Sequence, residues 1–558
     1  MKPKRHISGF LTTLVWTAVM LAGGGLLVPP CAEAVGSWTA LANTAPGGVS
    51  VMLLLSDGTV MAQNSGGNAW YRLTPDGHGS YANGTWTTDI HAMNDTRTFY
   101  SSDVLQDGRV FVAGGEDGTG GGKAEVYDAV ANGWTPTPIA GVGFADSQSR
   151  MLPGGNVLVA PVSWVPDPAW VNFIYNPYAN SWTEGPTNLE YQDEASWVKL
   201  PDDSILTLDP YGYYSSERYI PSLNKWIVDA VPPVQLFSSG NNEIGPGFML
   251  AGGRAFFLGG TGHTLYYTPT GNNSPGIWVQ GSDIPLGMVA QDAPSAMMVN
   301  GKILCEVSSS TSHNPVYFDE YDPVAKAFAQ TGSPGNATAG SSHSAKSDDT
   351  YMLDLPDGTV LYSDTGNRLY VYQPDGTPLA SGKPTINKAS WNTDGSLHLT
   401  GTLFNGISEG ASYGDDAQMD SNYPLARFTD GSGNVHYGRT YNWSSTSVQT
   451  GGNIVTTEVT VPGTVFDFPG TFSLQVVANG IASDPVTFYG PVWVDFNYNG
   501  IPFQLGWYSY PYNTLAQGVS AVVSGGTIVI KSSNSHETMT ISKPMTITSV
   551  YGPSTVGH

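Results

Sequence analysis

A unit of about fifty residues recurs along the chain between residues 36 and 375, a period typical of repeat folds. In its clearest copy, residues 96–138, an apolar strand ends at the turn Asp107-Gly108. The strand-like runs RVFVAGG (109–115), AEVYD (124–128) and GWT (133–135) follow. Each copy therefore has four short apolar segments separated by turn residues, which predicts a four-stranded antiparallel sheet.

Weaker copies of the unit cover residues 48–88, 146–184, 193–228, 243–280, 292–330 and 348–373. The last copy lacks its Trp strand, whereas Gly36-Ser-Trp38-Thr39 is a Trp strand with no copy before it. A ring that borrows this N-terminal strand for its last sheet leaves neither edge exposed. We therefore predict an all-β fold that begins with a seven-bladed β-propeller over residues 35–382. Its motifs resemble kelch repeats, and we interpret the Gly-Gly and Trp residues as packing positions between blades.

Beyond residue 382 the repeat stops and another β pattern begins. Segments 396–400, 455–461 and 471–477 alternate apolar and polar side chains, as half-buried strands do. We expect residues 383–490 to form one immunoglobulin-like β-sandwich.

The last segment, residues 491–558, differs again and predicts a short β-helix-like C-terminal tail. It has a candidate helix at 512–519, a strand at 527–531 and two further strands within 539–548. One coil of a β-helix cannot bury its own apolar face. We therefore expect the tail to dock on the sandwich or to assemble with a partner.

The N-terminus has the pattern of an export signal. Lys2, Lys4 and Arg5 precede a long apolar stretch, and Ala32-Glu33-Ala34 offers a small-x-small cleavage site. We expect residues 1–34 to be a signal peptide, and the mature chain to be secreted or held at the cell surface without a membrane span. A retained membrane anchor is the alternative, because the apolar stretch is long for a signal.

The composition is strongly acidic. The chain has 46 acidic and 22 basic residues and a formal net charge of −24, and loss of the signal segment would make this charge more negative. Such a charge argues against nucleic acid and anionic membranes as partners. It is compatible with the binding of cations or neutral glycans.

Acidic residues recur at one position of the predicted blades, shortly before the innermost strand. They are Asp146, Asp193, Glu194, Glu243, Asp292, Asp348 and Asp349. In a propeller these positions surround one channel mouth, where carboxylates repel one another unless a cation or a donor-rich ligand is present. Oxygen-only ligands suit Ca²⁺, and we predict Asp292, Asp348 and Asp349 as its ligands. Alternatively, these acids cap turns or face solvent.

Aromatic residues lie in predicted loops on the same face of the third and fourth blades. The candidates are Trp164, Trp170, Tyr211 and Tyr213. An exposed ring beside a carboxylate offers a sugar a flat apolar surface and an acceptor for its hydroxyl groups. Alternatively, each ring packs against a neighbouring loop. We predict that these aromatics and the acids bind a ligand together.

A kelch propeller followed by an immunoglobulin-like domain resembles galactose oxidase and glyoxal oxidase, the copper-radical oxidases, over residues 35–490. The resemblance implies a Cys–Tyr crosslink, a stacked Trp, a Tyr-His pair ahead of an inner strand, and a His from the last domain. In this sequence the crosslinked Tyr would fall near Phe99, with Tyr100 one place away. Asp348-Asp349 stands where Tyr-His is expected, and loop 412–424 has no His. Cys305 lies in the strand-like run ILCEV, where burial is expected. These departures argue against copper and copper-radical oxidation.

The sequence leaves three functions open. The first is a secreted propeller that binds a glycan or another cell-surface ligand at an acidic, aromatic-flanked mouth, with Ca²⁺. The second is a carbohydrate-active hydrolase or lyase that uses two carboxylates as acid and base. The third is a structural surface protein that assembles through its tail. Two carboxyl groups about 5–10 Å apart in an aromatic-lined cleft would favour the hydrolase, whereas acids spread around an open rim would favour binding.

Overall fold

The computed structural model describes residues 35–162, 170–211, 215–240, 242–414, 417–501 and 503–557, which lie within one compact unit from Val35 to His558. The predicted signal segment, residues 1–34, lies outside the described residues. Regular structure is almost entirely β, as predicted; the α-helices of the described chain are α1 (Gly463–Phe466) and α2 (Leu515–Ala521). Among the described residues, no helix is both long and apolar enough to cross a membrane.

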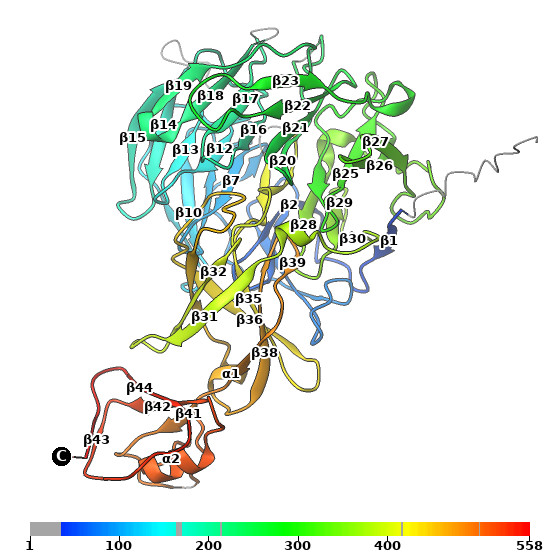
Figure 1. The fold of residues 1–558 in the computed structure, drawn as a ribbon. Helices are drawn as coiled ribbons and strands as arrows, with labels where there is room; N and C mark the ends of the chain where they lie inside the picture. The colour runs from blue at the N-terminus through cyan, green and yellow to red at the C-terminus, as the bar shows by residue number, and fades with distance from the viewer. Residues whose placement is uncertain are drawn as a thin grey trace, which may run out of the picture. The chain divides into compact units, whose positions relative to one another are not determined.

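Seven antiparallel blades of four strands each form the predicted seven-bladed propeller (Figure 1). The first three blades consist of β2 (Val49–Leu54), β3 (Val60–Asn64), β4 (Trp70–Thr74) and β5 (Thr85–Thr87); β7 (Ser101–Val104), β8 (Val110–Ala113), β10 (Ala124–Asp128) and β11 (Gly133–Pro136); and β12 (Ser149–Met151), β13 (Val157–Val159), β14 (Val171–Asn176) and β15 (Ser181–Thr187). A short pair, β6 (Arg97–Thr98) and β9 (Asp117–Gly118), accompanies the second blade.

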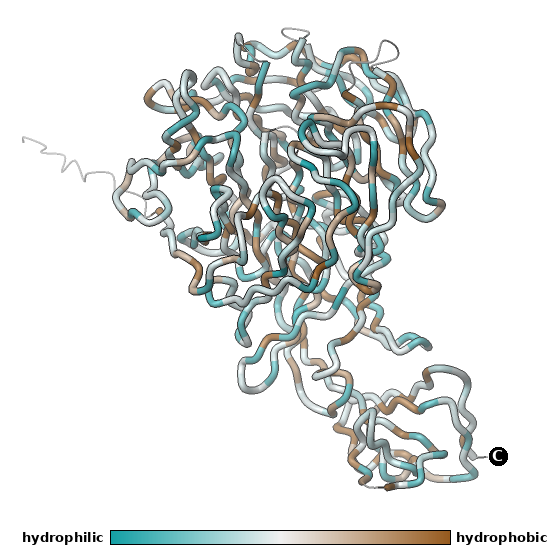
Figure 2. The backbone as a smooth tube through the Cα atoms, turned by 180° about the vertical axis from the view of Figure 1, so that it is seen from behind, coloured by the Kyte–Doolittle hydropathy of each residue, from teal (hydrophilic) through white to brown (hydrophobic). Residues whose placement is uncertain are grey.

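The next three blades follow the same pattern. They consist of β16 (Trp197–Lys199), β17 (Ile205–Leu208), β18 (Ser216–Ile220) and β19 (Lys225–Val228); β20 (Gly247–Leu250), β21 (Arg254–Leu258), β22 (Thr264–Thr268) and β23 (Ile277–Gln280); and β24 (Ser295–Met297), β25 (Ile303–Ser308), β26 (Val316–Asp322) and β27 (Ala327–Gln330). Figure 2 shows apolar and polar residues interspersed along these strands, and the apolar ones form the cores between neighbouring blades.

The seventh blade closes the ring with a strand from the other end of the propeller, as predicted. It consists of β28 (Tyr351–Asp354), β29 (Val360–Ser363), β30 (Tyr370–Gln373) and β1 (Ser37–Ala40). β1 pairs antiparallel with β30, and Trp38 lies opposite Tyr372. The Trp38 ring packs on Phe318, Tyr362 and Tyr372 at centroid distances of 4.8, 5.5 and 4.9 Å. The closing strand is therefore held by ring contacts as well as by its ladder.

The Asp-Gly turns join the first two strands of several blades through one recurring motif. Asp57 Oδ1 accepts hydrogen bonds from the Thr59 backbone N–H (3.0 Å) and hydroxyl (2.7 Å). Asp357 and Thr359 repeat this arrangement. Gly58 has a φ of 78°, a backbone conformation that glycine adopts without a steric penalty. The Asp-Gly repeat in the sequence thus reflects the same side-chain hydrogen bonds at the same turn of different blades.

In every blade except the sixth, where β27 carries Phe328 instead, the Trp residue of the fourth strand connects its blade to the preceding one. The indole N–H of Trp134 donates to His91 O at 2.8 Å, and that of Trp38 donates to Gly332 O at 2.9 Å. Equivalent indole hydrogen bonds to the preceding blade or its connection come from Trp86, Trp182, Trp226 and Trp278. This recurring contact supports the interpretation of the Trp residues as structural.

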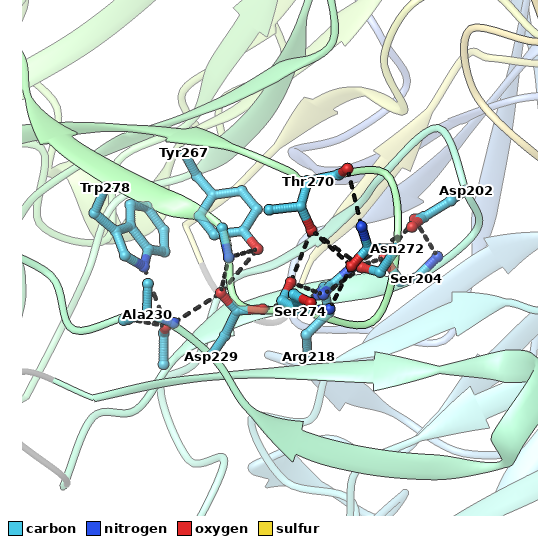
Figure 3. A network of polar contacts seen from close by, with 12 residues as sticks. Asp202, Ser204, Arg218, Asp229, Ala230, Tyr267, Thr270, Asn272, Ser274 and Trp278 are labelled. Carbon is cyan, nitrogen blue, oxygen red and sulfur yellow. Dashed lines mark hydrogen bonds and ion pairs between the residues drawn. The ribbon is translucent and has the colours of Figure 1, made fainter.

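A buried ion pair of the fourth blade is hydrogen-bonded to the fifth blade (Figure 3). Arg218 Nε donates to Asp229 Oδ2 at 2.9 Å, and both side chains are fully buried. The guanidinium also donates to the carbonyls of Asn272 and Ser274, and Tyr267 Oη donates to Asp229 at 2.8 Å. Loss of either partner would leave an uncompensated buried charge. The pair therefore fixes how these two blades meet.

A hairpin from beyond the propeller occupies the central channel, which the sequence did not predict. Strands β33 (Gly410–Ser412) and β34 (Gln418–Asp420) extend the sixth blade, because β33 pairs with the inner strand β24. The hairpin also contacts the inner strands β2, β7 and β28. At its base, Ser421 Oγ donates to Asp354 Oδ2, in the last residue of β28. The hairpin thus runs along the inner strands of several blades.

The remaining strands of residues 385–489 form one curled sheet. Its strands are β31 (Thr385–Trp391), β32 (Leu397–Thr402), β37 (Val455–Thr460), β36 (Val435–Tyr441), β35 (Leu425–Thr429), β38 (Thr471–Ala478), β39 (Ile481–Ala482) and β40 (Val486–Tyr489). The three predicted strands of this region are confirmed as β32, β37 and β38. The sheet curls around its own apolar core. Such a sheet is compatible with the immunoglobulin-like sandwich, which stays a prediction.

The tail has the parallel pairing of a β-helix. Strands β41 (Val492–Val494), β42 (Thr527–Lys531) and β44 (Thr546–Val550) pair in parallel, as do β43 (Asn534–Ser535) and β45 (Thr555–Val556). The helix α2 begins after the N-cap Thr514, close to the predicted position. Of the two strands predicted within residues 539–548, one is present as β44. The expectation of a second is wrong, because residues 539–545 pair with no neighbouring strand in the described chain. Trp493 Nε1 donates to Phe466 O at 2.8 Å, so the tail docks on the curled sheet.

We expect substitution of the closing strand's Trp38 by Ala to lower the free energy of unfolding by about 2–4 kcal/mol, because three ring contacts and a hydrogen bond are lost together. Guanidinium unfolding of the parent and the variant measures this change. Trp86→Ala is the matched control, since Trp86 occupies the same position in the first blade, whose four strands are contiguous in sequence. Equal effects of the two substitutions would contradict a special role of ring closure.

Candidate functional site

Five predicted acids from four consecutive blades come together at one end of the channel. Carboxylate oxygens of Asp146, Asp193 and Glu194 lie within 4.8 Å of one another. Those of Glu194, Glu243 and Asp292 form a second group at the same spacing, so Glu194 belongs to both. Asp292 is buried, and the other four are half-buried. The predicted convergence of these five residues is therefore present in the structure.

A shared backbone turn accounts for this convergence. Asp146, Glu194 and Asp292 each lie three residues before the first residue of an inner strand, at Ser149, Trp197 and Ser295. Each has a positive φ, of 40°, 60° and 43° respectively. Side chains other than glycine adopt this left-handed conformation at a cost of about 1 kcal/mol or more. The same turn in three blades places three equivalent carboxylates around one axis.

The tip of the channel hairpin reaches the acidic cluster. Gly414 has a φ of 77°, and a Cβ atom at this position would lie 3.1 Å from Ile244 O and 3.5 Å from Asp292 Cα. A larger residue would press on the backbone beside the cluster. Asp415 and Asp416 follow directly in sequence and lie outside the described residues. The site is therefore bordered by a segment that is remote from the blades in sequence.

Of the predicted aromatic residues, Tyr211 lies at the cluster. Its hydroxyl donates to Asp193 Oδ2 at 2.9 Å, its ring lies 5.6 Å from that of Tyr191, and it is 42% exposed. Burial and the Asp193 carboxylate raise the pKa of the Tyr211 hydroxyl well above its usual range. Trp170 is 45% exposed, just before β14.

The other two predicted aromatics, Trp164 and Tyr213, lie outside the described residues. Their role in ligand binding stays a prediction.

Asp348 and Asp349 belong to neither acidic group among the described residues. They form a short 3₁₀ turn before β28, where the Asp348 carboxylate lies 4.0 Å from His313 Nδ1. Burial and the neighbouring Asp348 carboxylate raise the pKa of Asp349. The structure thus separates these two predicted Ca²⁺ ligands from the third, Asp292.

The positions that the oxidase resemblance assigns to the copper centre hold an aromatic cluster. Tyr413, near the tip of the hairpin, stacks on Tyr351 at 5.4 Å and lies 6.1 Å from the Phe99 ring. Its hydroxyl donates to the Asp348 carbonyl at 2.7 Å. Cys305 is buried in β25, and burial raises the pKa of its thiol well above the usual range. Phe99 has no hydroxyl to crosslink, and the neighbouring Tyr100 is buried with its hydroxyl donating to Gln63 Oε1 at 2.8 Å. These residues therefore do not fit a copper-radical centre.

Below the acidic cluster, buried charged groups hold the hairpin in the channel. Glu409 Oε1 lies 3.0 Å from Arg150 Nε and 3.9 Å from Lys199 Nζ, which come from the inner strands β12 and β16. Burial raises the pKa of Asp103 to about 6. Burial and the Glu409 carboxylate raise the pKa of Asp420 well above its usual range. The three carboxyl groups outnumber the two cations here, and the Asp103 carboxylate adds to the rise in the pKa of Asp420.

The sequence did not reveal this network. The hairpin strands are only three residues long and have no clear alternation of apolar and polar residues. Glu409 and Asp420 occur in a stretch that otherwise has the composition of a loop. The role of Glu409 in the fold becomes visible only with its partners Arg150 and Lys199, which are more than two hundred residues away in sequence.

Comparisons with known proteins give no family assignment. No protein-family model and no curated protein sequence match the chain. Among solved structures, a novel fungal alcohol oxidase of the AA5 family, in complex with copper, aligns with a TM-score of 0.48 and 14% identity over 82% of this chain and 99% of that chain.

A second solved structure, a selenomethionine-substituted virginiamycin B lyase from Staphylococcus aureus, aligns with a TM-score of 0.41 and 10% identity, over 61% and 99% of the two chains. The order of a seven-bladed propeller followed by further β-structure, which the strand pairing shows directly, agrees with the predicted galactose-oxidase-like architecture.

The buried carboxyl group of Asp354, which accepts a hydrogen bond from Ser421 of the hairpin, predicts a specific pH dependence of stability. Burial raises the pKa of Asp354 from its usual 3.8 to about 8, and this effect outweighs the hydrogen bond from Ser421, which lowers the pKa. Between these values the folded state binds the proton more tightly than the unfolded state, so this group's contribution to stability falls as pH rises from about 4 to 8. We expect Asp354→Asn to remove this slope, which is at most about 1.4 kcal/mol per pH unit.

Urea unfolding at several pH values measures the slope. Ser421→Ala is the control, because it removes the hydrogen bond but leaves the carboxyl group buried. It should lower stability at every pH and retain the slope. Identical pH profiles for the parent and Asp354→Asn would contradict a neutral Asp354 in the fold.

Proposed function

We propose that this protein is an exported propeller protein that binds a glycan or a similar polyhydroxylated cell-surface ligand at its acidic mouth, with a bound Ca²⁺. The observation that carries the proposal is the convergence of five carboxylates in two groups that share Glu194. The acidic net charge of −24 supports a cation or a neutral ligand rather than a polyanion. The export pattern at residues 1–34 supports a role outside the cell.

The spacing of the carboxylates supports ion binding. Ca²⁺ binds oxygen ligands at about 2.3–2.6 Å, so two oxygens on one ion lie at most about 5 Å apart. The observed limit of 4.8 Å within each group meets this condition. The two carboxyl groups of a retaining glycosidase are about 5–5.5 Å apart, and those of an inverting one are farther apart. The spacing within each group therefore supports a shared cation.

The surroundings of the cluster suit a hydroxyl-rich ligand. Ca²⁺ takes six to eight oxygen ligands, so a group of three carboxylates leaves positions for water or for the hydroxyls of a sugar. Tyr211, half-exposed and hydrogen-bonded to Asp193, offers a ring beside these positions. Such a ring can stack on the apolar face of a sugar.

We expect Ca²⁺ to raise the melting temperature of the mature protein by about 2–5 °C at saturating concentration, because it binds the folded state selectively. Glu194→Gln, which removes the carboxylate common to both groups, should abolish the shift. Asp348→Asn combined with Asp349→Asn should retain it, since these residues lie in neither group. Differential scanning fluorimetry with Ca²⁺ and with EDTA measures the shifts. A shift that survives in Glu194→Gln would rule out this site.

The ligand part of the proposal has its own test. Binding of the mature protein to a glycan array should be stronger with Ca²⁺ than with EDTA, and Glu194→Gln should lower the Ca²⁺-dependent signal to the EDTA level. Glycan binding that does not respond to Ca²⁺ or to Glu194→Gln would contradict binding at the mouth.

A further inference from the structure

A second cleft lies outside the propeller, where the curled sheet meets the tail. A cavity of about 520 Å³ is lined by Trp391, Asn392, Asp394, Tyr441 and Glu458, among others. A neighbouring cavity of about 250 Å³ shares Asp394 and Tyr441 and adds Tyr551 of the tail. The two cavities therefore border one continuous strip of surface around the turn between β31 and β32.

The strand register sets the floor of this cleft. Tyr441 of β36 lies opposite Glu458 of β37, and Glu458 lies opposite His398 of β32. Residues directly opposite in neighbouring strands project from the same face of a sheet. An aromatic ring, a carboxylate and an imidazole thus lie in a row across three strands.

Hydrogen bonds within the chain hold the polar groups of the cleft in place. Glu458 Oε1 lies 2.7 Å from His398 Nδ1, and its Oε2 accepts from the side-chain amide of Asn392. The same Asn392 amide also donates to Ser396 Oγ at 2.8 Å. Both Glu458 oxygens are therefore engaged, and the carboxylate is held without needing a ligand.

Asp394 forms the corner of the turn between the two cavities. Its Oδ1 accepts from the Ser396 backbone N–H (2.9 Å) and hydroxyl (2.6 Å), which lowers the pKa of its carboxyl group. Among the described residues, no hydrogen bond to its Oδ2 is present. Tyr551 closes one side, since its backbone N–H donates to Thr393 O at 2.7 Å and a Cβ on Gly395 would lie 2.9 Å from its hydroxyl.

Two tyrosine rings flank this corner. Tyr441 is half-buried and lines both cavities, and the Arg439 guanidinium lies 5.1 Å from its ring centroid, which fixes the ring. Tyr551 is 54% exposed. Rings spaced around fixed amide and carboxylate groups are the arrangement that carbohydrate ligands use, because stacking and hydroxyl hydrogen bonds act together.

We propose that this cleft binds a neutral polysaccharide chain, independently of the acidic mouth. Glu458 is already paired with His398 and Asn392, so Asp394 is the carboxylate of the strip with an oxygen left for a ligand. One such acceptor suits a hydroxyl group and gives little preference for a cationic peptide. The acidic chain as a whole disfavours a polyuronate. Because hydrogen bonds already hold these side chains in place, binding costs little side-chain entropy, and this favours affinity.

Native affinity electrophoresis of the mature full chain tests this proposal, with galactomannan, xylan or mixed-linkage β-glucan in the gel and EDTA in the buffer. EDTA removes the contribution expected of the mouth, and Glu194→Gln should leave this retardation unchanged. We expect at least one neutral polysaccharide to retard the parent. Tyr441→Ala should weaken this retardation by about tenfold or more, as loss of a central aromatic contact does. Tyr441→Phe, which keeps the ring, should stay within about threefold of the parent.

Asp394→Asn is a second variant, because an Asn side chain can still accept the hydrogen bonds from Ser396 while its other atom becomes a donor. It should weaken binding but leave the unfolding midpoint near that of the parent. The proposal is overturned if no neutral polysaccharide retards the parent in EDTA, or if Tyr441→Ala and Tyr441→Phe behave alike. Retardation by polygalacturonate, or tighter binding of polylysine than of any neutral polysaccharide, would also overturn it.

Discussion

Pairing of β1 with β30 closes the propeller, and the convergence of its inner strands on one channel depends on this closure. In a closed ring the seven inner strands must converge on one channel, so residues that precede them meet at one end. A turn that recurs from blade to blade then gathers side chains from positions about fifty residues apart. The acids therefore come together without a separate long-range contact that positions each of them. The acidic cluster is thus a consequence of a local repeat combined with a closed ring.

The mouth of the channel is divided into two chemically different halves. Carboxylates come from the third to the sixth blades, and Glu194 connects them. Aromatic rings come from Phe99 of the second blade's entry, Tyr351 of the seventh blade and Tyr413 of the hairpin. Tyr351 and Tyr413 are buried, so these rings pack the hairpin against the blades, whereas the half-buried carboxylates border the mouth. This division explains why Asp348 and Asp349, although equivalent in the repeat, lie apart from the other acids.

The sequence predicted what depends on local chemistry and missed what depends on distant contacts. Asp-Gly turns, Trp strands and the spare strand at Trp38 are each visible within a few residues, and they led to the seven blades and their closure. The acids of the mouth followed from their place in the repeat. The hairpin at Gly410–Asp420 could not be predicted, because its short strands gain stability only from inner strands of several blades. The pairing of Glu409 with Arg150 and Lys199 depends on that insertion.

The hairpin has a consequence for how such a protein could evolve. Many propellers are exchanged between proteins as self-contained units, since their blades complete one another. Here the inner strands carry Arg150 and Lys199, whose acidic partner Glu409 belongs to the chain that follows the ring. Recombination at a breakpoint between the two regions would separate these charges, and each half would inherit an incomplete interior. The propeller and the segment that fills it are therefore expected to be inherited together, with the chain length between β30 and β33 kept sufficient to reach the channel.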